Sequence, residues 1–363
     1  MFGKGVRVWL AGGMLLALVA VAAGCGGGGG GGSNKQIALL LPENHTPRYE
    51  SLDKPDFEAK VKDLCSDCKV LYSNATQDAS KQQSQAEAAL TQGADVLVLD
   101  AVDAGSAGAI VAKAKAQNVP VVSYDRLVTN SDVDYYVSYD NVNVGKLQGN
   151  TLIKGLKAQS KPTGPVVMLA GDPADNNAKL FKQGANEALK AGGVKIAKTS
   201  DTPGWTADKA QTEMQQAITA LGNNGFTGVY AANDGTAGGA IAAMTSAGIQ
   251  PSTRPTTGQD AELAAVQRIL AGQQYMTVYK AVKLEAPAAA TIAVALSKGQ
   301  KPPTPPINGT TNNGKKDVPS TILTPVAVTK SNIAGTIVKD GFWTAAQICT
   351  GPYAAACKAN GIA

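Results

Sequence analysis

Short apolar runs alternate with longer amphipathic stretches along the first third of the chain. Continuous apolar runs predict buried strands at residues 37–41, 70–72, 96–99 and 121–124, and helical periodicity predicts helices at 57–64, 80–92 and 105–117. Strands that are apolar throughout are typical of parallel sheets that helices cover on both faces. This part of the chain therefore predicts a βαβ series around a parallel sheet.

A second series shows the same alternation. It predicts strands at 165–169, 194–197, 228–231 and 255–257, separated by helices at 178–191, 207–221 and 235–247. A chain of 363 residues exceeds one ordinary hydrophobic core. The expected fold class is therefore α/β, with two doubly wound parallel-sheet lobes. Later segments are expected to cross between the lobes, namely a strand at 276–279, an Ala-rich helix at 282–298, a Pro-rich loop at 302–306 and a strand near 322–328.

The N-terminus has the features of an export signal. Two basic residues precede an apolar run at 8–23, which is too short and too poorly flanked for a membrane-spanning helix. The small residues before Cys25 suit a signal peptidase, and Cys25 has the position of a lipid-modified cysteine. We expect a signal peptide at 1–24, a lipid on Cys25 and a Gly-rich tether at 25–34, with a plain secreted chain as the alternative.

Composition narrows the class of protein. Hydrophobic residues make up 44% of the chain and charged residues 17%, as in ordinary globular proteins, which excludes a disordered chain. The net charge of +5 is spread without a basic stripe, which argues against a nucleic-acid partner.

The cysteines indicate disulfides. Four of the five remain once Cys25 is assigned to a lipid, and an even number in an exported chain favours pairing. The spacing of Cys65 and Cys68 also fits a redox or metal clip, but a second such pair is missing from the sequence. We expect the local disulfides Cys65–Cys68 and Cys349–Cys357, with free thiols as the alternative, and no metal site.

Polar side chains follow the predicted strands at the points where the strands end. They are Asp125 with Arg126, Asp172, Asn233, Asp260 and Lys280. Open parallel sheets bind ligands just outside these ends of their strands. Carboxylates and cations that converge there from two lobes supply paired acceptors and donors, which suits a neutral polyhydroxylated ligand. Trp205, in the loop 202–205, offers an aromatic face for the C–H face of a sugar.

Signals for catalysis or a cofactor are weak. His45 is the only histidine and is expected to be an ordinary exposed residue. The glycines at 235–239 match neither the Walker spacing nor the dinucleotide spacing, so we expect no cofactor. Asp125 and Asp260 could be the paired carboxylates of a glycosidase, but adjacent Arg126 and Lys280 would keep them ionised and leave no proton donor. The chain is therefore expected to bind its ligand without transforming it.

Seven sequence blocks carry a family resemblance. They are Tyr124–Leu127, Asp134–Asn141, Asp175–Phe181, Asn233–Ala240, Gly258–Ala261, Met276–Lys280 and Asn312–Ser320. In these blocks the chain resembles the periplasmic sugar-binding proteins of bacterial ATP-binding-cassette (ABC) importers, most closely those for D-xylose, over residues 36 to 342 or thereabouts. The resemblance implies a type I periplasmic-binding-protein fold, in which two lobes joined by a three-crossover hinge close on the sugar.

The same resemblance implies where the chain passes between the lobes. Crossovers are expected near residues 139–140, 280–281 and 323–324. One lobe would then comprise 35–139 plus 281–323, and the other 140–280 plus 324–342, followed by a Cys-containing tail at 343–363.

The resemblance also implies nine ligand contacts. These are Arg48, Tyr49, Asp125, Arg126, Asn177, Trp205, Asn233, Asp260 and Lys280. The chain departs from the family pattern at 45–47, where its loop differs in length and charge. Structural alternatives stay open: helix caps for Asp125 and Asp260, a surface salt bridge for Arg126, a turn for Asn233, a hinge role for Lys280 and interlobe packing for Trp205.

These observations together predict a function. We expect a monomeric, exported substrate-binding lipoprotein that captures one monosaccharide, D-xylose above others, and delivers it to an ABC permease in the membrane. Its place would be the outer face of the cytoplasmic membrane or the periplasm. The alternatives are another monosaccharide, such as ribose or glucose, and a sensor that presents the bound sugar to a membrane receptor.

Overall fold

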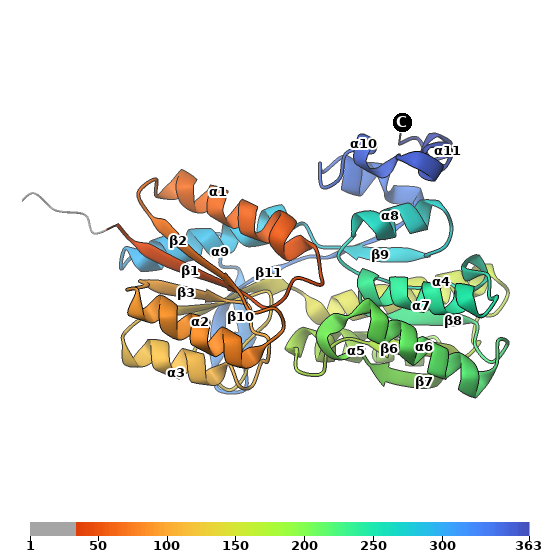
Figure 1. Ribbon diagram of the computed structural model, residues 1–363, viewed down its shortest axis with the longest axis horizontal. Coiled ribbons are helices and arrows are strands. Elements are labelled where there is room, and N and C mark those ends of the chain that lie inside the picture. The colour runs from red at the N-terminus through yellow and green to blue at the C-terminus, as the bar shows by residue number, and fades with distance from the viewer. Residues whose placement is uncertain (1–33, 363) are drawn as a thin grey trace, which may run out of the picture. The chain divides into compact units, whose positions relative to one another are not determined.

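The computed structural model describes residues 34–362, which belong to one compact unit (Figure 1). The predicted signal peptide 1–24, the lipidation site Cys25 and the tether up to residue 33 lie outside the described residues. Within residues 34–362, no helix combines the length and the apolar character that crossing a membrane requires.

The larger sheet has seven strands in the order β10-β11-β5-β4-β3-β1-β2. The strands are β1 (Gln36–Leu41), β2 (Lys69–Asn74), β3 (Val96–Leu99), β4 (Val121–Tyr124), β5 (Tyr135–Tyr139), β10 (Gly309–Asn312) and β11 (Asp317–Leu323). Only β10 pairs antiparallel, with β11, and the other pairs are parallel. Alternate β1 side chains enter two different cores, with Leu39 in one and Leu40 in the other, which explains why the run is apolar throughout.

Helices cover both faces of this sheet (Figure 1). On one face lie α1 (Lys54–Leu64) and α9 (Val282–Ser297). The short π-helix η1 (Tyr49–Asp53) directly precedes α1. On the other lie α2 (Ala79–Thr91) and α3 (Gly108–Ala116). The predicted parallel sheet between two helical layers is confirmed.

The second lobe repeats this arrangement around a smaller sheet, in the order β7-β6-β8. Its strands are β6 (Val166–Ala170), β7 (Ile196–Asp201) and β8 (Gly228–Ala231), all parallel. Helices α4 (Asn141–Ala158) and α5 (Asn176–Ala191) pack on one face, and α6 (Ala207–Leu221) and α7 (Asp234–Ser246) on the other. The fold is the predicted α/β type with two doubly wound lobes.

Two predicted strands differ from the structure. The segment 255–257 forms a single parallel bridge, Val229 with Thr256, because Pro255 lacks an N–H and the Thr257 hydroxyl bonds the backbone of Ala231. The single strand expected at 322–328 is two strands, β11 in the larger sheet and β12 (Val326–Thr329), which pairs antiparallel with β9 (Met276–Tyr279).

Helix α4 has 18 residues but was not predicted, because its packing face contains glycines. A Cβ on Gly145 would lie 2.0 Å from the carbonyl oxygen of Phe181, and one on Gly184 would lie 2.0 Å from that of Val142. Glycine at these positions therefore lets the backbones of α4 and α5 approach each other, at a cost in helix propensity that hides the helix from pattern analysis.

The chain passes between the two sheets three times. It leaves the larger sheet between β5 and α4, returns between β9 and α9, and leaves again between β11 and β12. The residue boundaries given above for the two lobes remain predictions.

The described C-terminal residues 334–362, which extend the predicted tail 343–363 toward the N-terminus and are called the tail from here on, pack on the second lobe as a set of short helices (Figure 1). The tail contains η5 (Ala334–Val338), α10 (Ala345–Ile348) and α11 (Ala354–Ala359), and its core includes Ile348, Cys357 and residues of α8 (Leu263–Leu270). Further short helices are η2 (Pro203–Trp205), η3 (Pro251–Thr253), η4 (Lys330–Asn332) and η6 (Gly351–Tyr353).

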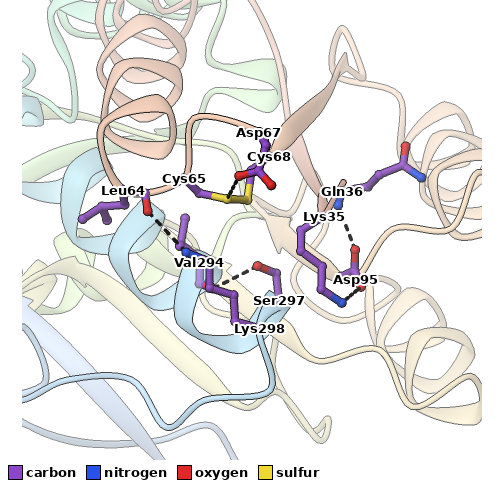
Figure 2. Close-up of a disulfide and its surroundings, with 10 residues drawn as sticks. All are labelled: Lys35, Gln36, Leu64, Cys65, Asp67, Cys68, Asp95, Val294, Ser297 and Lys298. Carbon is purple, nitrogen blue, oxygen red and sulfur yellow. Dashed lines mark hydrogen bonds and ion pairs between the residues drawn. A yellow bond between two sulfur atoms is a disulfide. The ribbon is translucent and has the colours of Figure 1, made fainter. Parts of the chain in front are cut away.

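Two disulfides are present among the described residues. Cys349 bonds Cys357 in the tail, with their Cα atoms 5.7 Å apart. Cys65 bonds Cys68 in the turn between α1 and β2, with their Cα atoms 5.3 Å apart (Figure 2). Asp67 lies beside this second pair, but both sulfurs are engaged in the disulfide.

Candidate functional site

One small cavity is lined by residues of both lobes. Its walls include all nine residues expected to contact ligand, so the structure brings the whole predicted set together. Four further residues complete the lining: Thr46, Asp175, Phe181 and Gln259. His45, as expected, is exposed and does not line the cavity.

The cavity residues lie where parallel strands end. Asp125 and Arg126 directly follow β4, and Lys280 directly follows β9. Asn177 lies in the first turn of α5, after β6, and Asn233 precedes α7, after β8. The positions follow the rule that open parallel sheets bind ligands at the carboxyl ends of their strands.

Arg48 is held from behind by two carboxylates. Its Nε and Nη2 donate to Asp53 at 2.9 and 2.6 Å, and its Nη2 also donates to Glu285 at 2.8 Å. Its Nη1 has no hydrogen-bond partner among the described residues, and lies 3.4 Å from Asp125 and 3.9 Å from Asp260. The guanidinium is therefore held in place while Nη1, at the cavity wall, makes no hydrogen bond among the described residues.

Lys280 links two cavity carboxylates. Its Nζ lies 3.3 Å from Asp260 Oδ1 and 3.9 Å from Asp125 Oδ1, and all three side chains are buried. Burial would raise the pKa of Asp125, but Lys280, Arg48 and Arg126 outweigh it and hold that pKa below its usual value. Asp125 is thus an acceptor of hydrogen bonds and not a proton donor, which argues against its use as a glycosidase acid.

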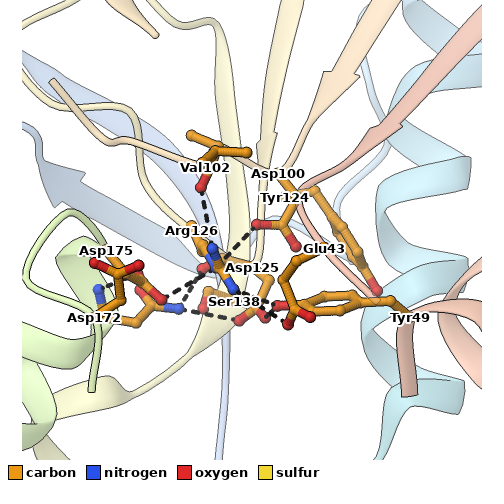
Figure 3. A network of polar contacts seen from close by, with 12 residues as sticks. Glu43, Tyr49, Asp100, Val102, Tyr124, Asp125, Arg126, Ser138, Asp172 and Asp175 are labelled. Atoms are coloured by element: carbon orange, nitrogen blue, oxygen red, sulfur yellow. Dashed lines mark hydrogen bonds and ion pairs between the residues drawn. The ribbon is translucent and has the colours of Figure 1, made fainter. Parts of the chain in front are cut away.

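Arg126 lies among three buried carboxylates (Figure 3). Its Nε is 3.1 Å from Asp175 and 3.5 Å from Asp100, and its Nη2 is 3.7 Å from Glu43. Burial raises the pKa of Asp100 well above its ordinary value, although Arg126 opposes the shift. The surface salt bridge considered for Arg126 is therefore wrong, because the side chain is buried.

Tyr49 connects Arg126 with Asp125. Its hydroxyl accepts a hydrogen bond from Arg126 Nη2 at 3.2 Å and donates to Asp125 Oδ2 at 3.3 Å. Figure 3 shows the hydroxyl end of Tyr49 pointing toward Asp125 and Arg126.

Trp205 is buried and anchored at its indole nitrogen. Nε1 donates to Asp175 at 3.2 Å, and the ring meets Phe181 edge to face with centroids 6.4 Å apart. A Cβ on Gly171 would lie 1.9 Å from the indole ring, so glycine is required for the ring to lie there.

Two alternatives for the polar residues are decided by the structure. Asn233 caps α7, because its side chain accepts from the N–H of Thr236, and it lines the cavity as well. Asp260 does not cap a helix, since the N-cap of α8 is Glu262; its Oδ1 has no hydrogen-bond partner in the described chain. Gln259 Oε1 is likewise free of hydrogen bonds within residues 34–362.

Sequence reasoning missed the residues behind the cavity. Asp100 directly follows β3, so the pattern that identified Asp125 also applied to it. Asp53 and Glu285 lie in helical segments, where no strand end points to a site. The available sequence signal for Glu285 is that it is a single carboxylate on the buried face of the Ala-rich helix α9.

Comparisons with known proteins identify the family of the chain. The model of the periplasmic binding protein domain family matches residues 37–301. The chain is 40% identical to the D-xylose-binding periplasmic protein of Escherichia coli, over 80% of this chain and 86% of the relative, and 41% identical to the protein of that name from Haemophilus influenzae, over 77% and 82%. A solute-binding protein of an ABC transporter from Clostridium phytofermentans, solved with bound β-D-glucose, superposes with a TM-score of 0.79 at 30% identity, covering 86% of this chain and all of that one. The chain therefore belongs to the sugar-binding periplasmic proteins with the type I fold, which are binding proteins and not enzymes.

Proposed function

We propose that the chain binds a single monosaccharide, D-xylose, in the cavity between its lobes. The observation that carries this proposal is a set of buried polar atoms, on residues that line the cavity, that make no hydrogen bond among the described residues: one donor, Arg48 Nη1, and two acceptors, Asp260 Oδ1 and Gln259 Oε1. Arg48 Nη1 and Asp260 Oδ1 have charged neighbours only at ion-pair distances of 3.3 Å or more. A buried polar atom without a hydrogen bond is unfavourable, and a sugar hydroxyl can both donate and accept.

The aromatic and charged lining of the cavity supports a sugar as the ligand. Trp205 and Phe181 supply apolar surface for the C–H groups of the ring, while the charged side chains face its hydroxyls.

The relatives suggest the ligand. Two of them, at 40% and 41% identity, are named for D-xylose, so D-xylose is the first candidate. Glucose is the competitor to test, because it is bound in the solved protein at 30% identity.

We also propose that the protein is exported as a monomer, is held at the membrane by a lipid on Cys25, and delivers its sugar to an ABC permease. The support is the sequence of the first 25 residues and the family of the chain. Replacing Cys25 with Ser should release the protein from the membrane fraction and remove the lipid mass. If the C25S protein stays in the membrane fraction and keeps the added lipid mass, the proposed anchor is wrong. Binding of the sugar-loaded protein to a receptor instead of a permease would favour the sensor role.

The direct test of the binding proposal is a thermal-shift screen of residues 34–363, the compact unit, against xylose, ribose, arabinose, glucose, galactose and inositol, followed by calorimetry. A selective rise in Tm with xylose is expected. Selectivity for another sugar would reject the ligand and keep the class, whereas no shift with any sugar would reject the proposed function.

A further inference from the structure

The segment Asp340–Trp343, between η5 and α10, lies against the two segments that carry Asp260 and Lys280. It is well beyond residues 37–301, which the family model matches. Neither of its aromatic side chains lines the sugar cavity.

Trp343 supports the segment that carries Asp260. Its Nε1 donates to the carbonyl oxygen of Ala261 at 2.7 Å. Asp260 and Ala261 have φ values of 89° and 50°, a region that residues other than glycine rarely adopt. Two successive residues in this unfavourable conformation need external support, and the indole N–H supplies part of it from the tail.

Asp340 holds the chain on both sides of Lys280. Its carboxylate accepts a hydrogen bond from Tyr279, the preceding residue, and lies 2.5 Å from Nζ of Lys283, which follows in α9. The Lys283 Nζ also donates to the Asp340 carbonyl oxygen at 2.8 Å. The backbone that presents Lys280 is thus fixed at two points to one tail residue.

Phe342 joins these contacts to the packing of both lobes. Its ring meets Tyr279 edge to face, with centroids 4.9 Å apart and planes inclined by 69°. It packs against the core beneath α1 and α9, and also against the core that the tail shares with α8.

We propose that Asp340, Phe342 and Trp343 are positioning residues for sugar binding, which hold Asp260 and Lys280 at their pairing distance of 3.3 Å. This inference rests on the proposed function. The tail then contributes to affinity through side chains that do not touch the sugar.

The test compares two variants in the same tail. Trp343→Phe keeps the aromatic surface but removes the N–H to Ala261, whereas Ile348→Ala removes buried surface from the core shared with α8 and leaves the hydrogen bonds of Trp343 and Asp340 in place. Trp343→Phe should raise the Kd for xylose by roughly fivefold to tenfold with little change in Tm, since one hydrogen bond is lost. Ile348→Ala should lower Tm and leave the Kd unchanged.

Hydrogen–deuterium exchange gives a readout that does not depend on sugar. Trp343→Phe should speed amide exchange at residues 258–262 in the unliganded protein, and Ile348→Ala should not. A second pair guards against misfolding: Asp340→Ala should weaken binding, and Asp340→Glu, which retains a carboxylate for Tyr279 and Lys283, should restore most of it.

The outcomes separate the two proposals. If the wild type binds a sugar and Trp343→Phe matches it in both Kd and exchange, the positioning role is wrong and the proposed function stands. Equal loss of affinity in Ile348→Ala would also reject the positioning role, because it would show a general effect of tail stability. If the wild type binds no sugar, the proposed function fails, and this inference fails with it.

Discussion

Arg48 and Glu285, 237 positions apart in the chain, meet in a buried hydrogen bond, in which Nη2 donates to Oε2 at 2.8 Å. The pair connects the start of η1 to α9, directly behind the cavity. Burial raises the pKa of Glu285 to about 8, with a contribution from Asp125, although Arg48 opposes the shift. The free energy of unfolding should therefore depend on pH through the Glu285 carboxyl.

Stability should fall as pH rises between about 4.5 and 8, because in this window the folded state holds a proton on Glu285 that the unfolded state has released. Glu285→Gln should remove this contribution, whose slope is at most about 1.4 kcal/mol per pH unit. Chemical denaturation at pH 5, 6.5 and 8 measures it. The exposed Glu187→Gln is the control, and an unchanged pH slope in Glu285→Gln would contradict the assignment.

Asp260→Asn should weaken sugar binding by roughly 10-fold to 100-fold, because a charge-assisted hydrogen bond to the ligand is replaced by a neutral one. Titration calorimetry measures the Kd. Asp208→Asn, on the exposed first turn of α6, should leave it unchanged. Wild-type affinity in Asp260→Asn would place the sugar elsewhere.

Arg126→Ala should abolish binding and also destabilise the fold, by roughly 3 to 5 kcal/mol, because it leaves buried carboxylates without their cation. The free energy of unfolding in urea is the measurement. For comparison, Lys182→Ala breaks the surface pair with Asp201 and should cost about 1 kcal/mol or less. Similar losses in the two variants would mean that Arg126 is not the common partner.

Gly145→Ala should destabilise the second lobe by about 1 to 3 kcal/mol, since the new Cβ would lie 2.0 Å from the Phe181 carbonyl oxygen and force α4 and α5 apart. Gly309→Ala, which meets no atom within 4 Å among the described residues, should change stability by less than about 0.5 kcal/mol. Thermal unfolding compares them, and a neutral Gly145→Ala would show that the helices can separate freely.

Replacing Cys349 and Cys357 with Ser should lower the free energy of unfolding by about 2 to 3 kcal/mol, as expected for the loop that this disulfide closes. The Cys65–Cys68 disulfide closes a shorter loop, so replacing both of its cysteines with Ser should lower the free energy of unfolding by less. Urea denaturation ranks the two, and thiol titration of the unfolded wild type should find both pairs oxidised. Free thiols there would contradict the pairing.

Sequence patterns predicted the site correctly where a residue lies at the cavity because it directly follows a buried strand. Runs such as Val121–Tyr124 are buried on both faces, and Asp125 and Arg126 necessarily emerge at the edge of the sheet. The cavity lining followed from this rule together with the family resemblance.

The patterns failed where a residue acts through a partner that is remote in the chain. Asp53 and Glu285 matter because both bond Arg48, and no local periodicity relates the three positions. Helix α4 was missed for the opposite reason, since its glycines satisfy a close contact with α5 and weaken the helical pattern itself.

That close contact has a mechanical consequence. Gly145 and Gly184 bring the backbones of α4 and α5 together, and the side chain of Asn141, at the start of α4, donates to Asn177 at 2.9 Å. We therefore expect α4 and α5 to move as one body when the chain rotates at the crossover after β5. Such a rotation would displace Asn177, which lines the cavity.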